Sequence, residues 1–214
     1  MENTFVTHIG TDESGKGDFF GPLVIAGVMV DSKSAELFKS LKIRDSKTIS
    51  DNTILKMSVD IKSNSKFSII TVGNERYNEL YKNFGNLNKL LAWGHAKVIE
   101  NILENNSCAY ALSDKFGDDS LILNALQKRG RTIRLEQMTK AESDIAVAAA
   151  SVLARATFVQ KMKQMALTYG CEFPKGCNSI VKDIAKKFIN LHGKDKLNEV
   201  CKTHFKTYKE ILSD

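Results

Sequence analysis

Short apolar runs and longer apolar stretches at helical spacing alternate along this chain. The runs at residues 8–12, 23–30 and 66–72 are rich in β-branched residues and predict strands. Apolar residues at three- and four-residue spacing over residues 88–104 predict a helix. The same criteria predict strands at residues 108–112 and 131–135, and helices at residues 33–41, 50–63, 74–83, 141–166, 179–191 and 195–212.

The order of these elements is an alternation of strands and helices that closes with helices alone. Such an order predicts an α/β fold, in which a mixed sheet is flanked by helices. From about residue 170 to residue 214 we expect a helical C-terminal extension. Because 214 residues are the size of one ordinary domain, residues 1–214 are expected to form a single unit.

Positive charge is concentrated in the second half of the chain. The net charge is +6, and residues 128–214 hold 17 Lys and Arg against 9 Asp and Glu, whereas residues 1–127 hold 14 against 16. This distribution is typical of a protein that binds a polyanion beside an acidic centre. The alternative is a lysine-rich surface that is simply solvated.

The start of the chain lacks the features of a targeting segment. It reads MENTFVTHIG, with an acid at position two and no apolar run behind a basic segment. The longest uncharged apolar stretch, residues 19–30, is too short to span a bilayer. We therefore expect a cytoplasmic protein without a membrane partner.

The four cysteines are irregularly spaced, which in a reducing compartment predicts free thiols. Cys171, Cys177, Cys201 and His204 could in principle form a zinc site. Because no C-x-x-C pair is present, we favour free thiols over this zinc site.

Residues 9–22, IGTDESGKGDFFGP, allow two interpretations. Their G-x-x-x-x-G-K spacing is that of a phosphate-binding loop, but such a loop needs Ser or Thr after the lysine and position 17 is glycine. Asp12 and Glu13 would also repel the phosphates that the loop must attract. The second interpretation, a metal site built on these carboxylates, is therefore favoured.

A metal site at this position has a geometric requirement. Adjacent residues of a regular strand face opposite sides, so we expect the strand to end between Asp12 and Glu13. Gly15 and Gly17 supply such a break and leave backbone N–H groups accessible to a ligand. A further acid, Asp114, follows an apolar run. Carboxylates beside a donor-rich loop suit a phosphodiester substrate.

The stretch DESGKGDFFGPLVIAGV is similar to the first signature of the type 2 ribonucleases H, and in particular of ribonuclease HIII. Further blocks resemble the same family in the same order: Arg44-Asp45-Ser46-Lys47, Asn74-Glu75-Arg76-Tyr77-Asn78, Ser113-Asp114-Lys115-Phe116, Thr139-Lys140-Ala141-Glu142 before AVAAASVLAR, Phe173-Pro174-Lys175-Gly176 and Lys202-Thr203-His204-Phe205. Together they cover nearly the whole chain.

The resemblance implies a ribonuclease H-like fold with a five-stranded mixed sheet. It also implies that the chain cuts the RNA strand of RNA–DNA hybrids and leaves 5′-phosphate and 3′-hydroxyl ends. Two Mg²⁺ or Mn²⁺ ions would serve the reaction. The implied catalytic acids are Asp12, Glu13, Asp114 and Glu142, the first three of them as metal ligands, and the implied contacts to the RNA strand are Gly15, Lys16 and Gly17.

Several points stay open within this resemblance. The fourth acid is expected to be Glu142. Asp144 is the alternative, because the segment between Glu142 and Ser151 is one residue shorter than in the family members that it resembles. His95 and His204 are given no role in the site. Many ribonucleases HIII carry an extra N-terminal domain that grips the hybrid, whereas the signature here begins at Asp12. We therefore expect a short, monomeric form whose lysine-rich C-terminal half supplies affinity for the hybrid.

Two alternative functions remain. Ribonucleases HII cut at RNA–DNA junctions, but they carry G-R-G in the loop and a tyrosine after a later Lys-Gly, where this chain has G-K-G and Cys177. The other alternative is a noncatalytic module that binds hybrids. Such a module would have no use for clustered like-charged carboxylates, which are costly without cations.

Overall fold

The computed structural model describes residues 5–44, 46, 49–118, 120–127 and 130–213. One five-stranded sheet runs through it in the order β3-β2-β1-β4-β5. Its strands are β1 (His8–Ser14), β2 (Leu23–Val30), β3 (Lys66–Val72), β4 (Tyr110–Asp114) and β5 (Arg134–Met138). The β1–β2 and β2–β3 pairs are antiparallel and the β1–β4 and β4–β5 pairs are parallel. The predicted mixed sheet is confirmed.

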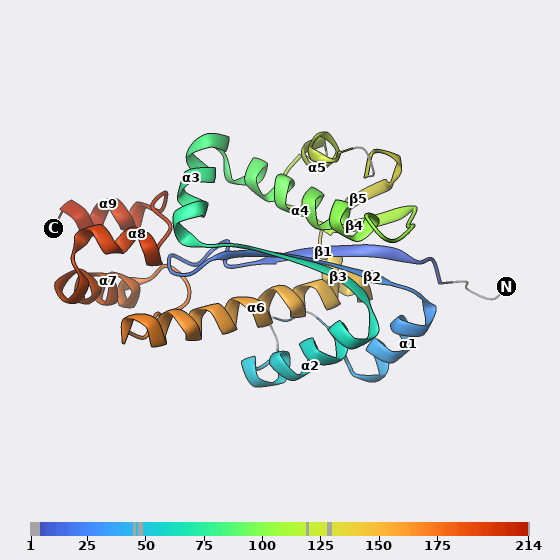
Figure 1. The fold of residues 1–214 in the computed structure, drawn as a ribbon, viewed down its shortest axis with the longest axis horizontal. Helices are drawn as coiled ribbons and strands as arrows, with labels where there is room; N and C mark the ends of the chain where they lie inside the picture. The colour runs from blue at the N-terminus through green and yellow to red at the C-terminus, as the bar shows by residue number, and fades with distance from the viewer. Residues whose placement is uncertain (1–4, 45, 47–48, 119, 128–129, 214) are drawn as a thin grey trace.

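Helices cover both faces of this sheet (Figure 1). One face carries α1 (Ser32–Ser40), α2 (Asp51–Asn64) and α6 (Ile145–Tyr169), and the other carries α3 (Asn74–Phe84), α4 (Leu87–Leu103) and α5 (Ser120–Ala125). The C-terminal helices α7 (Ser179–His192), α8 (Leu197–Val200) and α9 (Lys206–Ser213) gather at one end of the molecule, which confirms the expected helical extension. Short 3₁₀ turns lie at Gly130–Thr132 (η2), Ala141–Ser143 (η3) and Lys194–Lys196 (η4).

The long helix α6 is the core helix of the fold. It is long and apolar enough to cross a membrane by composition, but 72% of its most apolar window is buried inside the protein. It lies against β1 at Gly10, where a Cβ atom would come within 2.2 Å of the backbone of Ala146 and Val147. A glycine at this position therefore sets how closely the helix approaches the sheet.

The C-terminal extension holds the loop that follows β1. Phe20 forms a β-bridge with Cys201, and the backbone N–H of Gly176 donates to the Asp18 carboxylate at 2.5 Å. The fully buried ammonium of Lys202 donates to the carbonyl oxygens of Asp18, at 2.8 Å, and Gly21, at 2.6 Å. Burial lowers the pKa of Lys202 to about 7.

The contacts of Cys201 and Lys202 with the segment after β1, which together with that of Gly176 form a clamp, explain why one predicted helix is interrupted. The expected single helix over residues 195–212 is divided into η4, α8 and α9, because residues 201–205 leave the helical path between α8 and α9. There, the backbone of Lys202 donates to the Phe19 carbonyl at 2.9 Å. Tertiary pairing thus replaces the local helical hydrogen bonds that the apolar spacing predicted.

Gly10→Ala should destabilise the protein strongly, because the added methyl group would collide with the α6 backbone. We expect the free energy of unfolding to fall by at least about 3 kcal/mol, the upper part of the range for overpacked cores. Urea denaturation measures this. Gly17→Ala is the matched control, since a methyl group added there would have nothing within 4 Å. Equal stability of the two variants would contradict the proposed packing.

Candidate active site

Asp12 and Glu13 leave opposite faces of β1. The strand continues to Ser14, with Asp12 paired to Ala26 and Glu13 paired to Ile25, so the predicted strand end between the two acids is wrong. Asp12 is hydrogen-bonded to a serine of α6, and Glu13 to a histidine of α4. The two carboxylates therefore lie on opposite sides of the sheet, although their charges interact.

The half-buried Asp12 lies on the α6 side. Burial and the neighbouring Glu13 charge raise its pKa, although its hydrogen bonds to the Glu13 N–H and to Ser151 act in the opposite direction. Ser151 in turn hydrogen-bonds to Ser46 at 2.7 Å. Ser46 belongs to the Arg44–Lys47 block of the sequence, of which Asp45 and Lys47 lie outside the described residues. Ser46 thus supports Asp12 through Ser151.

Glu13 lies on the α4 side, and its side chain is only 8% exposed. Its Oε2 accepts from His95 Nε2 at 3.1 Å, and its Oε1 is 2.6 Å from Lys16 Nζ. Burial acts to raise the pKa of Glu13, but His95 and Lys16 outweigh it and lower that pKa. Both oxygens of Glu13 therefore have a donor.

Asp114 ends β4 directly beside Asp12. The parallel register pairs Thr11 with Ser113, and each acid is the next residue of its strand, so Asp12 and Asp114 lie side by side. Asp114 Oδ1 accepts from the Ala141 N–H at 3.3 Å. This bond brings the η3 turn, which contains Glu142, to the same end of the sheet.

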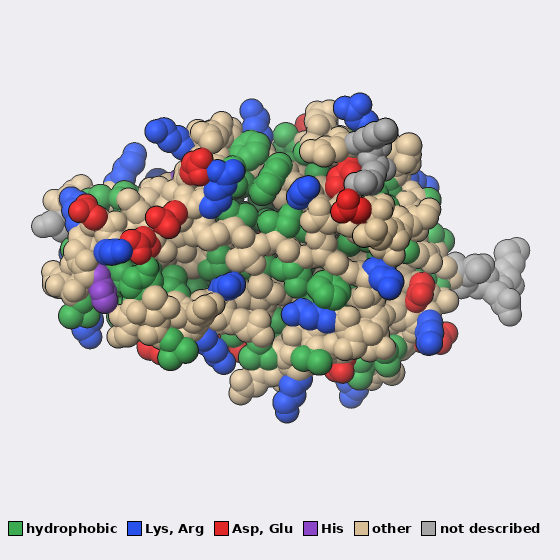
Figure 2. All heavy atoms as spheres, in the orientation of Figure 1, with side chains coloured by type: hydrophobic (Ala, Val, Ile, Leu, Met, Phe, Trp, Pro, Cys, Tyr) green, Lys and Arg blue, Asp and Glu red, His purple; other side chains and the backbone are tan. Residues whose placement is uncertain are grey.

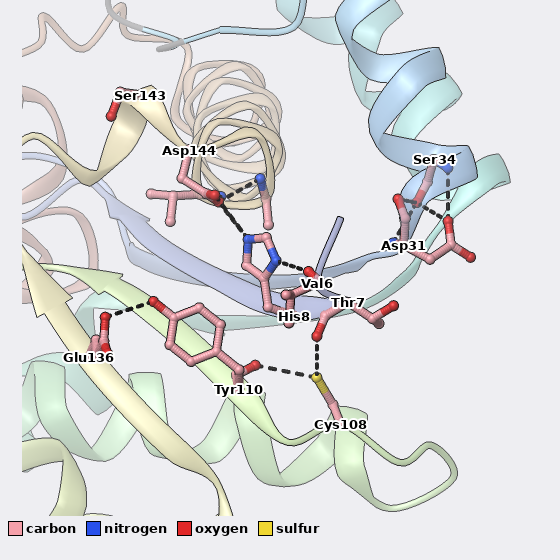
Figure 3. Close-up of polar contacts among 12 residues, drawn as sticks. Val6, Thr7, His8, Asp31, Ser34, Cys108, Tyr110, Glu136, Ser143 and Asp144 are labelled. Atoms are coloured by element: carbon pink, nitrogen blue, oxygen red, sulfur yellow. Dashed lines mark hydrogen bonds and ion pairs between the residues drawn. The ribbon is translucent and has the colours of Figure 1, made fainter. Parts of the chain in front are cut away.

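Glu142 and Asp144 have different surroundings, although they are two residues apart. The half-buried Glu142 has no side-chain partner within the part of the chain that the structure describes. Asp144 caps α6 by accepting from Ala146 and Val147, and both of its oxygens lie 2.9 Å from His8 Nε2 (Figure 3). The carboxylate of Asp144 is thus already used by the fold.

The loop after β1 carries the predicted substrate contacts. Gly15 has φ +88°, and a Cβ there would lie 2.2 Å from the Pro22 carbonyl oxygen, so this position requires glycine. Gly17 is exposed with open space around it. The Lys16 side chain is 42% exposed and feels the charges of Glu13, Asp12 and Asp114. Lys16 is therefore the cation that faces the carboxylates.

In the described ranges, no three His, Cys, Asp or Glu side chains are already gathered in a metal-binding arrangement. Both oxygens of Glu13 are instead directed to His95 and Lys16. The donor set itself fits a hard divalent cation, since three carboxylates approach one end of the sheet and a side-chain ammonium is their neighbour. An exchange of Lys16 for a cation would complete such a site.

Two other sequence-based assignments can be compared with the structure. All four cysteines are free thiols, as expected. The sequence assigns no role to His95, but this residue contacts Glu13 from the interior. The pattern around it could not reveal this contact, because the apolar spacing of residues 88–104 marks only a buried helix face and Glu13 lies 82 residues away.

A mixed sheet of this strand order, with acids side by side on two neighbouring parallel strands, is typical of a ribonuclease H-like protein. The sequence model described as ribonuclease HII matches residues 9–208. The chain therefore belongs to the ribonuclease HII family.

Two similar relatives are ribonucleases HIII. The protein from Protochlamydia amoebophila is 42% identical over 205 residues, which cover 96% of this chain and 68% of the relative. The protein from Chlamydia felis is 46% identical over 208 residues, which cover 95% and 69%.

Solved structures agree with this assignment. Bst-RNase HIII in complex with Mn²⁺ matches with a TM-score of 0.90 and 28% identity, over 99% of this chain and 71% of that chain. Ribonuclease H2 from Pyrococcus horikoshii OT3 matches with a TM-score of 0.82 over 97% of this chain and 98% of that chain. At 21% identity, this second match shows the shared fold alone.

The His8–Asp144 pair should make stability depend on pH. Burial lowers the pKa of His8, but Asp144 and the Val6 carbonyl outweigh it and raise that pKa above 6.5. Its contribution is therefore complete below pH 6.5 and is lost as the pH rises through the raised value. The pKa of Asp144 is lowered below 3.8, since His8 outweighs burial, so its contribution is lost as the pH falls through that lowered value.

His8→Gln should consequently cost most between about pH 4 and pH 6.5, on the order of 1–2 kcal/mol for a partly buried pair. Urea denaturation across this range and up to pH 9 measures the difference. In an Asp144→Asn background, which keeps a good helix cap, the pH-dependent part should vanish. A cost that is constant with pH would refute the ion pair.

Proposed function

We propose that this protein is an endoribonuclease that cuts the RNA strand of RNA–DNA hybrids by metal-dependent hydrolysis, at the site formed by Asp12, Glu13, Asp114 and Glu142. The observation that carries the proposal is the convergence of acids from β1 and β4 at one end of the sheet, beside the loop of residues 15–17, with the η3 turn tied to Asp114. Membership of the ribonuclease HII family supports the same reaction.

Asp12, Glu13 and Asp114 would hold two Mg²⁺ or Mn²⁺ ions. When bound, such ions lower the pKa of an attacking water and stabilise the leaving 3′-oxygen. The protein supplies the arrangement of charge. Its carboxylates are held by hydrogen bonds to Ser151, His95 and the Ala141 N–H.

Glu142 is the proposed fourth acid. It follows Ala141, whose N–H is bonded to Asp114, and its own carboxylate is not engaged by any described residue. Asp144 would have to give up both the cap of α6 and its contact with His8 in order to serve. Glu142 is therefore better suited to orient a water or a metal.

The loop of residues 15–17 is proposed to contact the RNA strand. Bare backbone at Gly15 and Gly17 can approach 2′-hydroxyl and phosphate groups closely, and contact with the 2′-hydroxyl distinguishes RNA from DNA. The clamp formed by Gly176 and Lys202 holds the residues that follow this loop. The loop is thus presented from a rigid base.

Affinity for the hybrid is proposed to come in part from the lysines of the C-terminal half, through neutralisation of phosphates. On the face that Figure 2 shows, basic and acidic side chains are mixed over the C-terminal helices. Among these lysines, Lys175 is paired with Asp51 at 2.8 Å, Lys182 with Glu210 at 2.6 Å and Lys196 with Glu199 at 2.7 Å. Exposed lysines of this half would carry the role by exchanging such contacts for phosphates. Cytoplasmic location, a single domain and a monomeric state stay predictions from the sequence.

Three of the four acids, and the alternative acid Asp144, can be tested by single substitutions. Asp12→Asn, Asp114→Asn and Glu142→Gln should each lower hybrid cleavage by more than about a hundredfold, beyond the effect typical of residues that only support metal ligands. Asp144→Asn should retain most activity, because asparagine also caps a helix. Initial rates with Mg²⁺ and with Mn²⁺ measure this.

The control for this series is Glu136→Gln, an acid of neighbouring β5 whose partners are Tyr110 and Arg134. Full activity of Asp114→Asn would overturn the proposed site. A duplex DNA with one embedded ribonucleotide should be a poor substrate for the wild-type protein. Efficient cutting there would instead favour the ribonuclease HII type of activity.

Lys16→Met should affect metal and substrate in opposite directions. Removal of the ammonium frees Glu13 Oε1, so Mn²⁺ binding without substrate should tighten about two- to fivefold, the equivalent of an exposed ion pair. The KM for the hybrid should rise because a phosphate contact is lost. Calorimetry and steady-state kinetics measure the two effects. Lys33→Met, on α1, is the control. Unchanged Mn²⁺ affinity of Lys16→Met would contradict the proposed exchange of the Lys16 ammonium for a metal ion at Glu13.

A further inference from the structure

His95 lies in the interior of the protein, on the face of α4 that packs against the sheet. Its side chain is 0% exposed. The helix can come this close because the preceding residue is Gly94, where a Cβ atom would lie 2.7 Å from Ile25 Cδ1 of β2. A small residue at position 94 thus lets the imidazole of His95 reach β1 and β4.

Each nitrogen of this imidazole has a partner on the sheet. Nε2 is 3.1 Å from Glu13 Oε2, while Nδ1 is 2.8 Å from Thr11 Oγ1 and 3.4 Å from Ser113 Oγ. The ring is stacked on Phe116, with 4.9 Å between the ring centroids and 28° between the planes. These contacts fix both the position and the rotation of the ring.

The hydrogen bonds also define the proton on His95. A carboxylate only accepts, so the proton of this bond is on Nε2. Nδ1 faces the Thr11 hydroxyl, which can donate to it. A proton on Nε2 therefore gives Glu13 a hydrogen-bond donor from the interior of the protein.

This arrangement differs from simple packing. A leucine of similar size would fill the same space, but it would leave the 8% exposed Glu13 carboxylate with Lys16 as its side-chain donor. Lys16 is 42% exposed and lies on a loop, so a metal ion can replace it at Glu13. His95 is fully buried, so a ligand from solvent does not replace its contact. His95 is also too deeply buried to touch a substrate.

We infer that His95 is a positioning residue for Glu13: it holds Oε2 from the interior, so that Oε1 alone faces the substrate side and is available to a metal ion. The inference rests on the proposed function, because it assigns Glu13 to the metal site. Partners behind a metal ligand commonly change metal affinity or activity by about 10–100-fold when they are removed. His95 acts through Glu13 and takes no part in the reaction itself.

The test compares three variants of the full-length protein. His95→Leu removes both polar contacts, His95→Gln keeps an N–H donor, and Thr11→Val removes the hydroxyl at Nδ1 with little change of shape. Mn²⁺ affinity without substrate is measured by calorimetry, and kcat and KM are measured on an RNA–DNA hybrid. Thermal unfolding of each variant identifies the temperature range in which it is folded.

We expect His95→Leu to weaken Mn²⁺ binding about tenfold and to lower kcat while KM for the hybrid is unchanged. His95→Gln should recover most of both losses, and Thr11→Val should lie between Gln and Leu. A purely structural role would lower the unfolding temperature of the variants and leave Mn²⁺ affinity normal while they are folded. That result would overturn the inference. If His95→Leu does not fold, wild-type Mn²⁺ affinity in both other variants overturns it equally.

Asp114→Asn separates this inference from the proposed function. It should abolish Mn²⁺ binding whatever residue is at position 95. If Asp114→Asn binds Mn²⁺ like the wild-type protein, the proposed metal site is wrong. If Asp114→Asn loses binding but His95→Leu and Thr11→Val keep it, the site stands and the role of His95 is refuted.

Discussion

The constraint on which this site depends is the repulsion among carboxylates at one end of the sheet. Asp12, Glu13 and Asp114 approach one another where water is scarce, and burial together with the charge of Glu13 raises the pKa of Asp12. Without a divalent cation, the protein offsets this repulsion with its own groups. Lys16 supplies a positive charge from the solvent side and His95 supplies an N–H from the interior. Positive charge and N–H donors are needed here because the register of β1 and β4 places Asp12 beside Asp114.

The rest of the fold keeps these groups in place from several directions. Helix α6 can lie on β1 because Gly10 has no side chain, and Ser151 of that helix then reaches Asp12. The C-terminal extension holds the loop after β1 through Gly176 and through the buried Lys202. Segments more than 150 residues apart in the chain thus meet around one short loop. Blocks that are far apart in the sequence, such as those containing Asp18, Gly176 and Lys202, are therefore neighbours in the fold.

Local patterns predicted the elements well where local interactions decide them. The strands at residues 23–30 and 66–72 have the predicted bounds, since β-branched residues there are also buried or paired. Predictions failed where distant contacts decide. The first strand continues past Asp12 because β2 pairs with it up to Ser14. The helix expected over residues 195–212 is interrupted because Cys201 pairs with Phe20. His95 was missed because its partner Glu13 is far away in the sequence.

The neighbouring acids Glu142 and Asp144 show how one short segment separates stability from chemistry. Asp144 lies at the N-terminus of α6, where a negative charge is favourable, and the buried His8 adds a second reason for it to stay there. The fold therefore holds the Asp144 side chain in place, and it can move toward a ligand only by breaking these contacts. Glu142 lies in a turn whose backbone is tied to Asp114, and its longer side chain has no described partner to leave. We therefore propose that Glu142, the acid that the helix does not need, is the one that serves the reaction.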